Sequence, residues 1–149
     1  MEHNYWFKSE LFQIQKGEDK ETNPDCYGKE LGTWLCKQFK ELGYKNVALI
    51  PEGWGWCVMC SNTDYMLWVG CGSIRTDEGD DNFDSASPPN SKDIVWHTFT
   101  VAEVPIFYFK SLVKKLFGML NVDKPLRKLD TELAQILNSE PRIELCEEP

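Results

Sequence analysis

The stretch Pro51–Ile74, PEGWGWCVMCSNTDYMLWVGCGSI, decides the fold because it has the pattern of a β-hairpin. Successive side chains of a strand point to opposite faces of a sheet. One face of the first arm (54–61) then carries Trp54, Trp56, Val58 and Cys60. One face of the second arm (65–73) carries Tyr65, Leu67, Val69 and Cys71. Ser61–Asp64 supplies short polar side chains that favour a chain reversal. Both faces of both arms are largely apolar, so we expect the hairpin inside a sheet that is covered on each side.

A helix before the hairpin is predicted from residue 24 to residue 42. Asn23 and Pro24 have the pattern of an N-cap followed by proline at the first helical position. Apolar residues then recur at helical spacing and form one stripe, and Gly43 is expected to end the helix in a left-handed conformation. Gly28 and Gly32 lower the helix propensity, which indicates close packing against the sheet.

The remaining segments predict strands and a C-terminal helical pair. We expect strands at 4–15, 47–50 (stopped by Pro51), 94–101 and 143–145. Helical spacing of apolar residues predicts helices over 107–120 and 124–138, with Asp123 as a cap. The fold class is therefore α+β: a single domain with a mainly antiparallel sheet of four to six strands, packed against one N-terminal helix and the C-terminal pair, which covers the other face or an edge.

Composition excludes several classes of function. The chain has 149 residues and a formal net charge of -8. Nucleic-acid binding depends on lysine and arginine, so the charge argues against it. No leader and no apolar run of ~18 residues is present, so we expect no membrane association. The six cysteines then indicate reduced thiols in a cytoplasmic protein rather than a disulfide framework.

Cys57 and Cys60 have the C-x-x-C spacing of redox and zinc sites. Residues three apart on a strand point to opposite faces, so the two thiols converge only if the strand bulges there. We therefore interpret them as packing cysteines, with a metal or redox pair as the alternative. Gly70-Cys71-Gly72 lacks the following helix of a phosphate loop, and we interpret it as a bend or a close approach of another backbone. No cofactor or metal is predicted.

His97 is the default candidate for acid–base chemistry, because the other histidine, His3, is expected to be disordered. A structural or surface role is the simpler interpretation of His97. A partnership with Cys57 or Cys71 stays open, since such partners meet in space and not in sequence.

Residues 75–92, RTDEGDDNFDSASPPNSK, form a predicted mobile acidic loop that is longer than usual for a compact domain. Its spacing does not fit an EF-hand, because Pro88 stands where the bidentate glutamate belongs. A solvated loop is the simplest interpretation. The alternative is a segment that attracts a basic surface. Its steering residues would be Asp77, Glu78, Asp80, Asp81 and Asp84.

Trp54 and Trp56 either fill the core or form an exposed aromatic ledge for a ligand or partner. We expect at least one of them in the core. Glycines flank Trp54 on both sides, so Trp54 is predicted to be the exposed member and the anchor for a partner.

The runs ELGTWLCKQFKELGY (30–44), PEGWGWCV (51–58) and LWVGCG (67–72) resemble a group of small uncharacterised bacterial proteins. In that group a helix that ends in Gly-Tyr leads to a PE-x-W-G-W strand. The resemblance covers residues 24–72. It implies a bacterial or phage setting and no activity, substrate or site residue.

These observations favour an acidic binding protein of the immunity or inhibitor kind, which neutralises a partner protein with a basic surface. Residues 77–84 would steer the encounter and Trp54 would anchor it. No catalytic constellation is evident, so an enzyme is not the first choice. The alternative is a small-molecule binder or thiol-dependent enzyme that uses His97 with Cys57 or Cys71.

Overall fold

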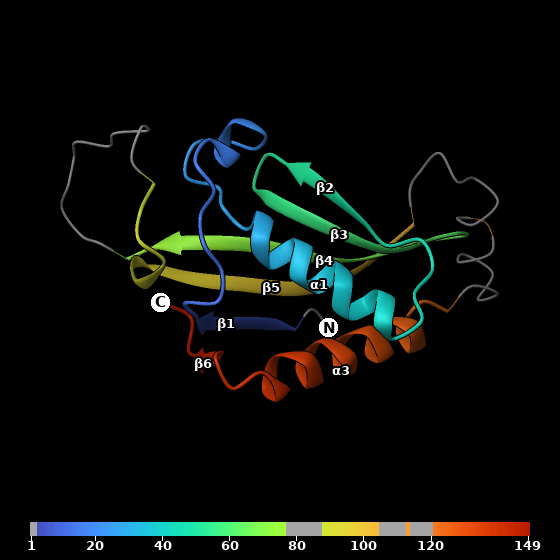
Figure 1. The fold of residues 1–149 in the computed structure, drawn as a ribbon. Helices are drawn as coiled ribbons and strands as arrows, with labels where there is room; N and C mark the ends of the chain where they lie inside the picture. Colours follow the sequence, from blue (N-terminus) through green and yellow to red (C-terminus); the bar gives the residue numbers. More distant parts are fainter. Residues whose placement is uncertain (1–2, 77–87, 105–112, 114–120) are drawn as a thin grey trace.

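The structure, a computed structural model, describes residues 3–76, 88–104, 113 and 121–149 (Figure 1). Six strands and two helices of more than one turn are described in these ranges: β1 (Asn4–Lys8), α1 (Lys29–Glu41), β2 (Ala48–Glu52), β3 (Gly55–Asn62), β4 (Met66–Arg75), β5 (Ile94–Glu103), α3 (Asp123–Ser139) and β6 (Glu144–Cys146). Two short 3-10 helices lie at Glu18–Lys20 and Ser91–Asp93. The α+β class is confirmed.

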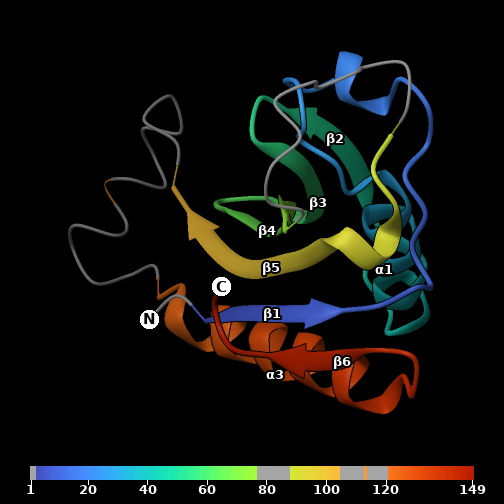
Figure 2. The same ribbon diagram turned by 90° about the vertical axis from the view of Figure 1, so that its left-hand side faces the viewer.

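The strands form one sheet in the order β2-β3-β4-β5-β1-β6, and every neighbouring pair is antiparallel. The predicted hairpin, β3 and β4, and its position inside the sheet are confirmed, whereas the described helices cover only one of its two faces. The N-terminal strand β1 lies between β5 and β6, with β6 at the edge (Figure 2). Segments from both ends of the chain therefore complete one half of the sheet.

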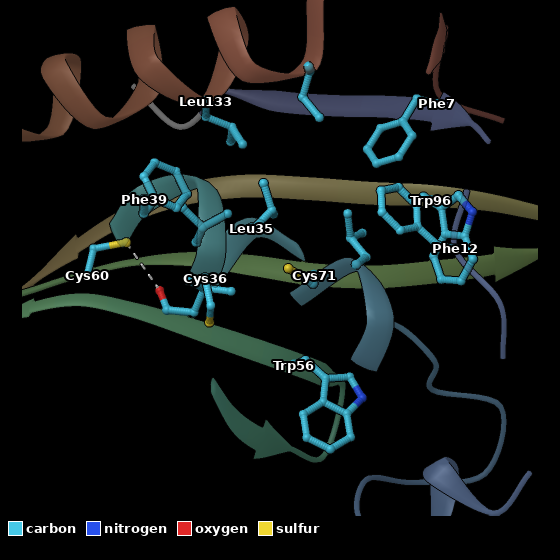
Figure 3. Packing of buried hydrophobic residues seen from close by; sticks show 14 of the residues in the cluster. Phe7, Phe12, Leu35, Cys36, Phe39, Trp56, Cys60, Cys71, Trp96 and Leu133 are labelled. Carbon is cyan, nitrogen blue, oxygen red and sulfur yellow. Dashed lines mark hydrogen bonds between the residues drawn. The ribbon is translucent and has the colours of Figure 1, made fainter. Parts of the chain in front are cut away.

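Both described helices pack on one face of the sheet, called here the helical face. Leu31, Leu35 and Phe39 of α1 and Leu129 and Leu133 of α3 belong to one buried apolar cluster. Figure 3 shows Leu133 pointing toward Phe39 and Leu35. The expectation that the C-terminal helices cover the other face or an edge is therefore wrong for α3. The predicted helix 107–120 lies outside the described residues apart from Val113.

The alternation of the strands sorts the core as predicted. Val58 of β3, Val69 of β4 and Trp96 of β5 are buried on the helical face. The ladder shifts register between Met59 and Ser61, so β3 contains a bulge there. Bulges bend the strand and increase its twist. The turn of the hairpin follows at 63–65.

Helix α1 begins later than predicted and is capped from elsewhere in the chain. Its first residue is Lys29, and Gly28 is the N-cap with φ 142°. The Glu18 carboxylate accepts hydrogen bonds from the backbone N–H groups of Gly28 (2.9 Å) and Lys29 (3.2 Å), which lack partners within the helix. This carboxylate replaces the predicted cap at Asn23, and the prediction of a start at Pro24 is wrong.

The end of α1 is as predicted. Gly43 has φ 100°, and its N–H donates to the carbonyl of Lys40 (3.0 Å) while Tyr44 N–H donates to that of Phe39 (3.2 Å). These two bonds form a Schellman motif, which satisfies the last carbonyls of the helix. Gly32 also has its predicted role, because a Cβ there would lie 2.5 Å from Leu49 Cδ1.

Several predicted strand boundaries change. The first strand ends at Lys8 and not near residue 15. Pro51 does not stop β2, which continues to Glu52. Because β2 is the edge strand, a residue without an N–H donor is tolerated there. The strand predicted at 143–145 is β6, one residue later.

Candidate functional site

The face of the sheet opposite the described helices carries a continuous cluster of aromatic rings. The aromatic cluster, as it is called below, consists of Trp6 on β1, Trp54 in the turn between β2 and β3, Trp68 on β4, and His97 and Phe99 on β5. These rings come from four separate segments, and each lies against at least one other. The face that holds them is called here the aromatic face.

The rings pack directly against one another. Trp6 and His97 are stacked with ring centroids 3.8 Å apart and planes 6° apart. His97 lies 5.0 Å from Phe99. Phe99 lies 5.5 Å from Trp54 and 5.8 Å from Trp68, and the two indoles are stacked at 5.8 Å. Such pairs add to the burial of each ring and restrict its movement.

Simple alternation places three of these side chains. Trp68 follows the buried Leu67 on β4, and His97 and Phe99 flank the buried Thr98 on β5. Neighbours of buried residues on a strand point to the opposite face. Gly70 lies across the ladder from Phe99, and its missing side chain leaves space for the phenyl ring.

Trp54 reaches the aromatic face because of Gly55. Gly55 has φ 155°, and a Cβ at this position would lie 2.4 Å from the carbonyl oxygen of Cys71. This backbone conformation interrupts the alternation, so Trp56 is buried on the helical face (2% exposed) while Trp54 packs on Trp68 and is 41% exposed. The prediction that Trp54 is the exposed member is confirmed. The expectation that both indoles share one face is wrong.

His97 is neutral and fixed in this cluster. Its Nε2 lies 2.8 Å from Asn4 Oδ1, and its ring is stacked on Trp6. Burial lowers the pKa of His97, and the nearby carboxylate of Glu148 opposes part of that shift. The imidazole therefore extends the aromatic surface as an uncharged ring.

Carboxylates border the aromatic cluster. The alternation of β2, β5 and β6 directs Glu52, Glu103 and Glu144 to this face. Burial raises the pKa of the Cys57 thiol to about 12, and the charges of Glu52 and Glu103 add to that rise. Among residues that the described strands direct to this face, Lys8 is the one cation, and its partner in the ladder is Glu144. The face is thus aromatic and negatively charged.

Cys57, Cys60 and Cys71 do not form a reactive site. Cys60 lies in the core of the helical face, while Cys57 faces the other way beside Gly70. Burial raises the pKa of Cys60, and of Cys71, which is fully buried. Thiolates, and not thiols, are nucleophiles, so these groups are inert in the folded chain.

His97 is paired with neither Cys57 nor Cys71. Cys71 belongs to the core of the helical face and His97 to the opposite face, so the sheet separates them. Cys57 shares the face with His97 but is 5% exposed with a raised pKa. No group of three histidine, cysteine, aspartate or glutamate side chains in the described ranges is placed to hold a metal ion.

The predicted acidic residues lie outside the described part of the chain. Asp77, Glu78, Asp80, Asp81 and Asp84 fall within residues 77–87. Their role in steering a partner stays a prediction, as does the role of Trp54 as an anchor.

The glycines of Gly70-Cys71-Gly72 have separate explanations. Gly70 accommodates a ring rather than a backbone, whereas the Cys71 carbonyl is approached by Gly28 and Gly55.

A polar cluster separate from the aromatic cluster connects the N-terminal strand to α3. The carboxylate of Asp130 accepts hydrogen bonds from the hydroxyl groups of Tyr5 (3.0 Å) and Thr100 (3.3 Å). Burial and this carboxylate raise the pKa of Tyr5 to about 12. His3, which was expected to be disordered, lies with Nδ1 3.7 Å from Asp130 Oδ2. The raised pKa keeps the Tyr5 hydroxyl group protonated, and the Asp130 carboxylate holds both hydroxyl groups in place, so we interpret the cluster as structural.

Three members of the aromatic cluster, Trp6, Trp68 and Phe99, were missed as site residues by the sequence analysis, and His97 was considered there for acid–base chemistry and not as part of an aromatic surface. The signal was present, because Trp68, His97 and Phe99 alternate with buried residues on two neighbouring strands. What was missing was the strand order, which places Trp6 of β1 beside His97. That neighbour relation joins residues far apart in the sequence.

Comparisons with known proteins leave the family open. No family model, curated protein or solved structure matches the chain. Of the helices that the structure describes, none combines the length and the apolar character needed to cross a membrane.

Proposed function

We propose that this chain is an acidic protein-binding module that inhibits or neutralises a partner protein with a basic surface, as immunity proteins and inhibitors do. The observation that carries the proposal is the aromatic cluster, with a 41% exposed indole and a border of carboxylates. Binding energy at interfaces concentrates in a few aromatic and charged anchors, and tryptophan is among the most enriched.

The charge supports a basic partner. The net charge of -8 accelerates encounters with cationic proteins and disfavours nucleic acids. We assign the steering role to the five acidic residues of 77–84, since charges outside the contact mainly change the association rate. Trp54 then supplies the contact that slows dissociation.

The chemistry of the thiols supports a binding protein over the thiol-enzyme alternative. Cys57, Cys60 and Cys71 all have raised pKa values, and none lies beside an activating histidine. All six cysteines are unpaired, which supports the proposed cytoplasmic location, where thiols stay reduced. The bacterial setting rests on the resemblance of residues 24–72 alone.

The test compares the proteins that three immobilised forms of the chain capture from a bacterial lysate. The forms are the native chain, Trp54→Ala and the control Leu42→Ala. Leu42 is an exposed apolar residue (49%) at the end of α1, away from the aromatic face. We expect a basic bacterial protein that binds the native chain and the control and is lost from Trp54→Ala. Its purified activity should fall when the native chain is added. A partner retained by Trp54→Ala, or one whose activity is unchanged, contradicts the proposal.

A further inference from the structure

We infer that the anchor from the partner is an arginine side chain, whose guanidinium group stacks on the exposed side of the Trp54 indole and pairs with the carboxylate of Glu52. This inference rests on the proposed function, since it names the group that the aromatic face recognises.

The packing of Trp54 leaves one side of its ring for a ligand. Trp68 is stacked against the indole with planes 27° apart, and Phe99 contacts it at 5.5 Å. Yet the side chain is 41% exposed. The two neighbours hold the indole in place, so a ligand that stacks on it does not have to immobilise a mobile side chain.

The rings are too close together to enclose a cation between them. Their centroids are 5.5 Å to 5.8 Å apart, which is the distance of direct ring contact. A small quaternary ammonium group, which needs several rings around it, is therefore not favoured. A flat group that lies on one ring matches the geometry better.

The charges select a cation for this position. Glu52 precedes Trp54 by two residues, and Glu103 lies on β5 beyond Phe99. Glu52 pairs with Gly55 at the start of β3, whereas Glu103 pairs with Met66, level with the end of that strand. Glu52 therefore borders Trp54 and Glu103 borders Trp68, while Lys8 lies at the far end of the cluster beside Glu144. A cation over the indole gains both the attraction of the ring and that of the Glu52 carboxylate.

Arginine fits this arrangement better than lysine. Its guanidinium group is planar and weakly hydrated, so it stacks on an indole and still presents its N–H donors at the edge, toward carboxylates. The lysine ammonium is a strongly hydrated point charge. A second copy of this chain would bring carboxylates against carboxylates, and a nucleic acid would bring phosphates against them.

The experiment uses three capped Gly-Ser peptides that differ only in carrying arginine, lysine or the neutral analogue citrulline. Their binding is followed by the resonance of the Trp54 indole N–H, assigned by its loss in Trp54→Phe. We expect the arginine peptide to shift this resonance and to bind about tenfold more tightly than the lysine peptide. The citrulline peptide should not bind.

Variants separate stacking from simple burial and from loss of folding. Trp54→Leu keeps an apolar side chain without a ring, and its binding is followed by the backbone amide resonance of Gly55; the affinity for the arginine peptide should fall by about tenfold. Glu52→Gln should weaken it similarly, whereas Glu103→Gln and Leu42→Ala should have a clearly smaller effect. The inference is overturned if the arginine and lysine peptides bind with equal affinity. It is also overturned if Trp54→Leu leaves the affinity for the arginine peptide unchanged. The inference is also overturned if self-association of the chain, or the binding of DNA, shifts the indole resonance and the arginine peptide does not shift it.

The two proposals fail separately. If the captured partner still depends on Trp54 while the arginine peptide meets none of the criteria, the arginine assignment is wrong and the proposed function stands. If the captured partner binds Trp54→Leu and Trp54→Ala as it binds the native chain, the proposed function is wrong as well.

Discussion

The phenyl ring of Phe99 occupies the space where a side chain on Gly70 would begin. A Cβ at Gly70 would lie 2.3 Å from Phe99 Cζ and 2.5 Å from Cε1. The two residues are partners across β4 and β5, and Phe99 in turn contacts Trp54, Trp68 and His97. The absence of one methyl group therefore positions the centre of the aromatic cluster.

Gly70→Ala should lower the free energy of unfolding by about 1 to 3 kcal/mol, because the added methyl group displaces a ring held on several sides. Urea denaturation measures the change. The control is Gly72→Ala on the same face of the same strand, where a Cβ would meet no atom within 4 Å. The control should cost clearly less. Equal losses in the two variants would show that Phe99 does not fill this space.

Removal of the Glu18 cap should destabilise the chain. Glu18 is 3% exposed and accepts backbone N–H groups at the start of α1. Glu18→Ala leaves these donors buried and unpaired, so we expect a loss of about 1 to 3 kcal/mol by urea denaturation. The exposed Glu41, near the end of the same helix, provides the control Glu41→Ala, which should change stability by less than about 0.5 kcal/mol. A small loss at Glu18 would refute its role as the cap.

Stability should fall as the pH drops below about 6.5, the ordinary pKa of histidine. The pKa of His97 is lowered in the folded chain, so the unfolded chain binds the proton more readily in this range. The stability is complete above the unfolded pKa and is lost as the pH falls toward the folded pKa. His97→Phe keeps a ring against Trp6 and should lose less stability between pH 7 and pH 5. Identical pH profiles of the urea midpoint would exclude His97 as the cause.

Buried thiols should resist alkylation in the folded chain. Burial raises the pKa values of Cys57 and Cys71, so their thiolates are scarce at neutral pH. Iodoacetamide labelling with mass spectrometry should modify the exposed Cys146 and spare Cys57 and Cys71 until urea is added. Stoichiometric labelling of Cys57 or Cys71 without urea would favour the thiol-enzyme alternative.

The acidic residues at 77–84 should control the rate of association. Replacement of all five by their amides should slow association with the basic partner and flatten its salt dependence, with a smaller effect on dissociation. Stopped-flow mixing at two salt concentrations measures both. Glu41→Gln gives the effect of one charge removed elsewhere on the surface. Unchanged association kinetics in the fivefold variant would remove these residues from the account.

Local patterns were enough to predict much of the fold. The period-two pattern predicted β3 and β4, and the sorting of β5 between two faces followed from the same rule. Gly43 predicted the end of α1 because a left-handed residue there has few alternatives. These signals depend on neighbours in the sequence, which is why they could be read from it.

Long-range contacts account for what the sequence did not predict. The cap of α1 comes from Glu18 and not from the adjacent Asn23, so a local rule chose the wrong residue. At Gly55 the backbone passes close to the Cys71 carbonyl of the neighbouring strand, and only glycine fits there. The backbone conformation of Gly55 places Trp54 and Trp56 on opposite faces of the sheet. The exposure of Trp54 was predicted from the sequence. Its packing against Trp68 and Phe99 was not, because predicting it requires the order of the strands in the sheet.

The central claim is that the aromatic face is the surface that contacts the partner. Hydroxyl-radical footprinting of the chain, alone and bound to the captured partner, tests this most directly, because exposed indoles and apolar side chains are oxidised. We predict that the partner protects Trp54 and leaves Leu42, at the end of α1, oxidised as before. Protection of Leu42 with unchanged oxidation of Trp54 would contradict the account.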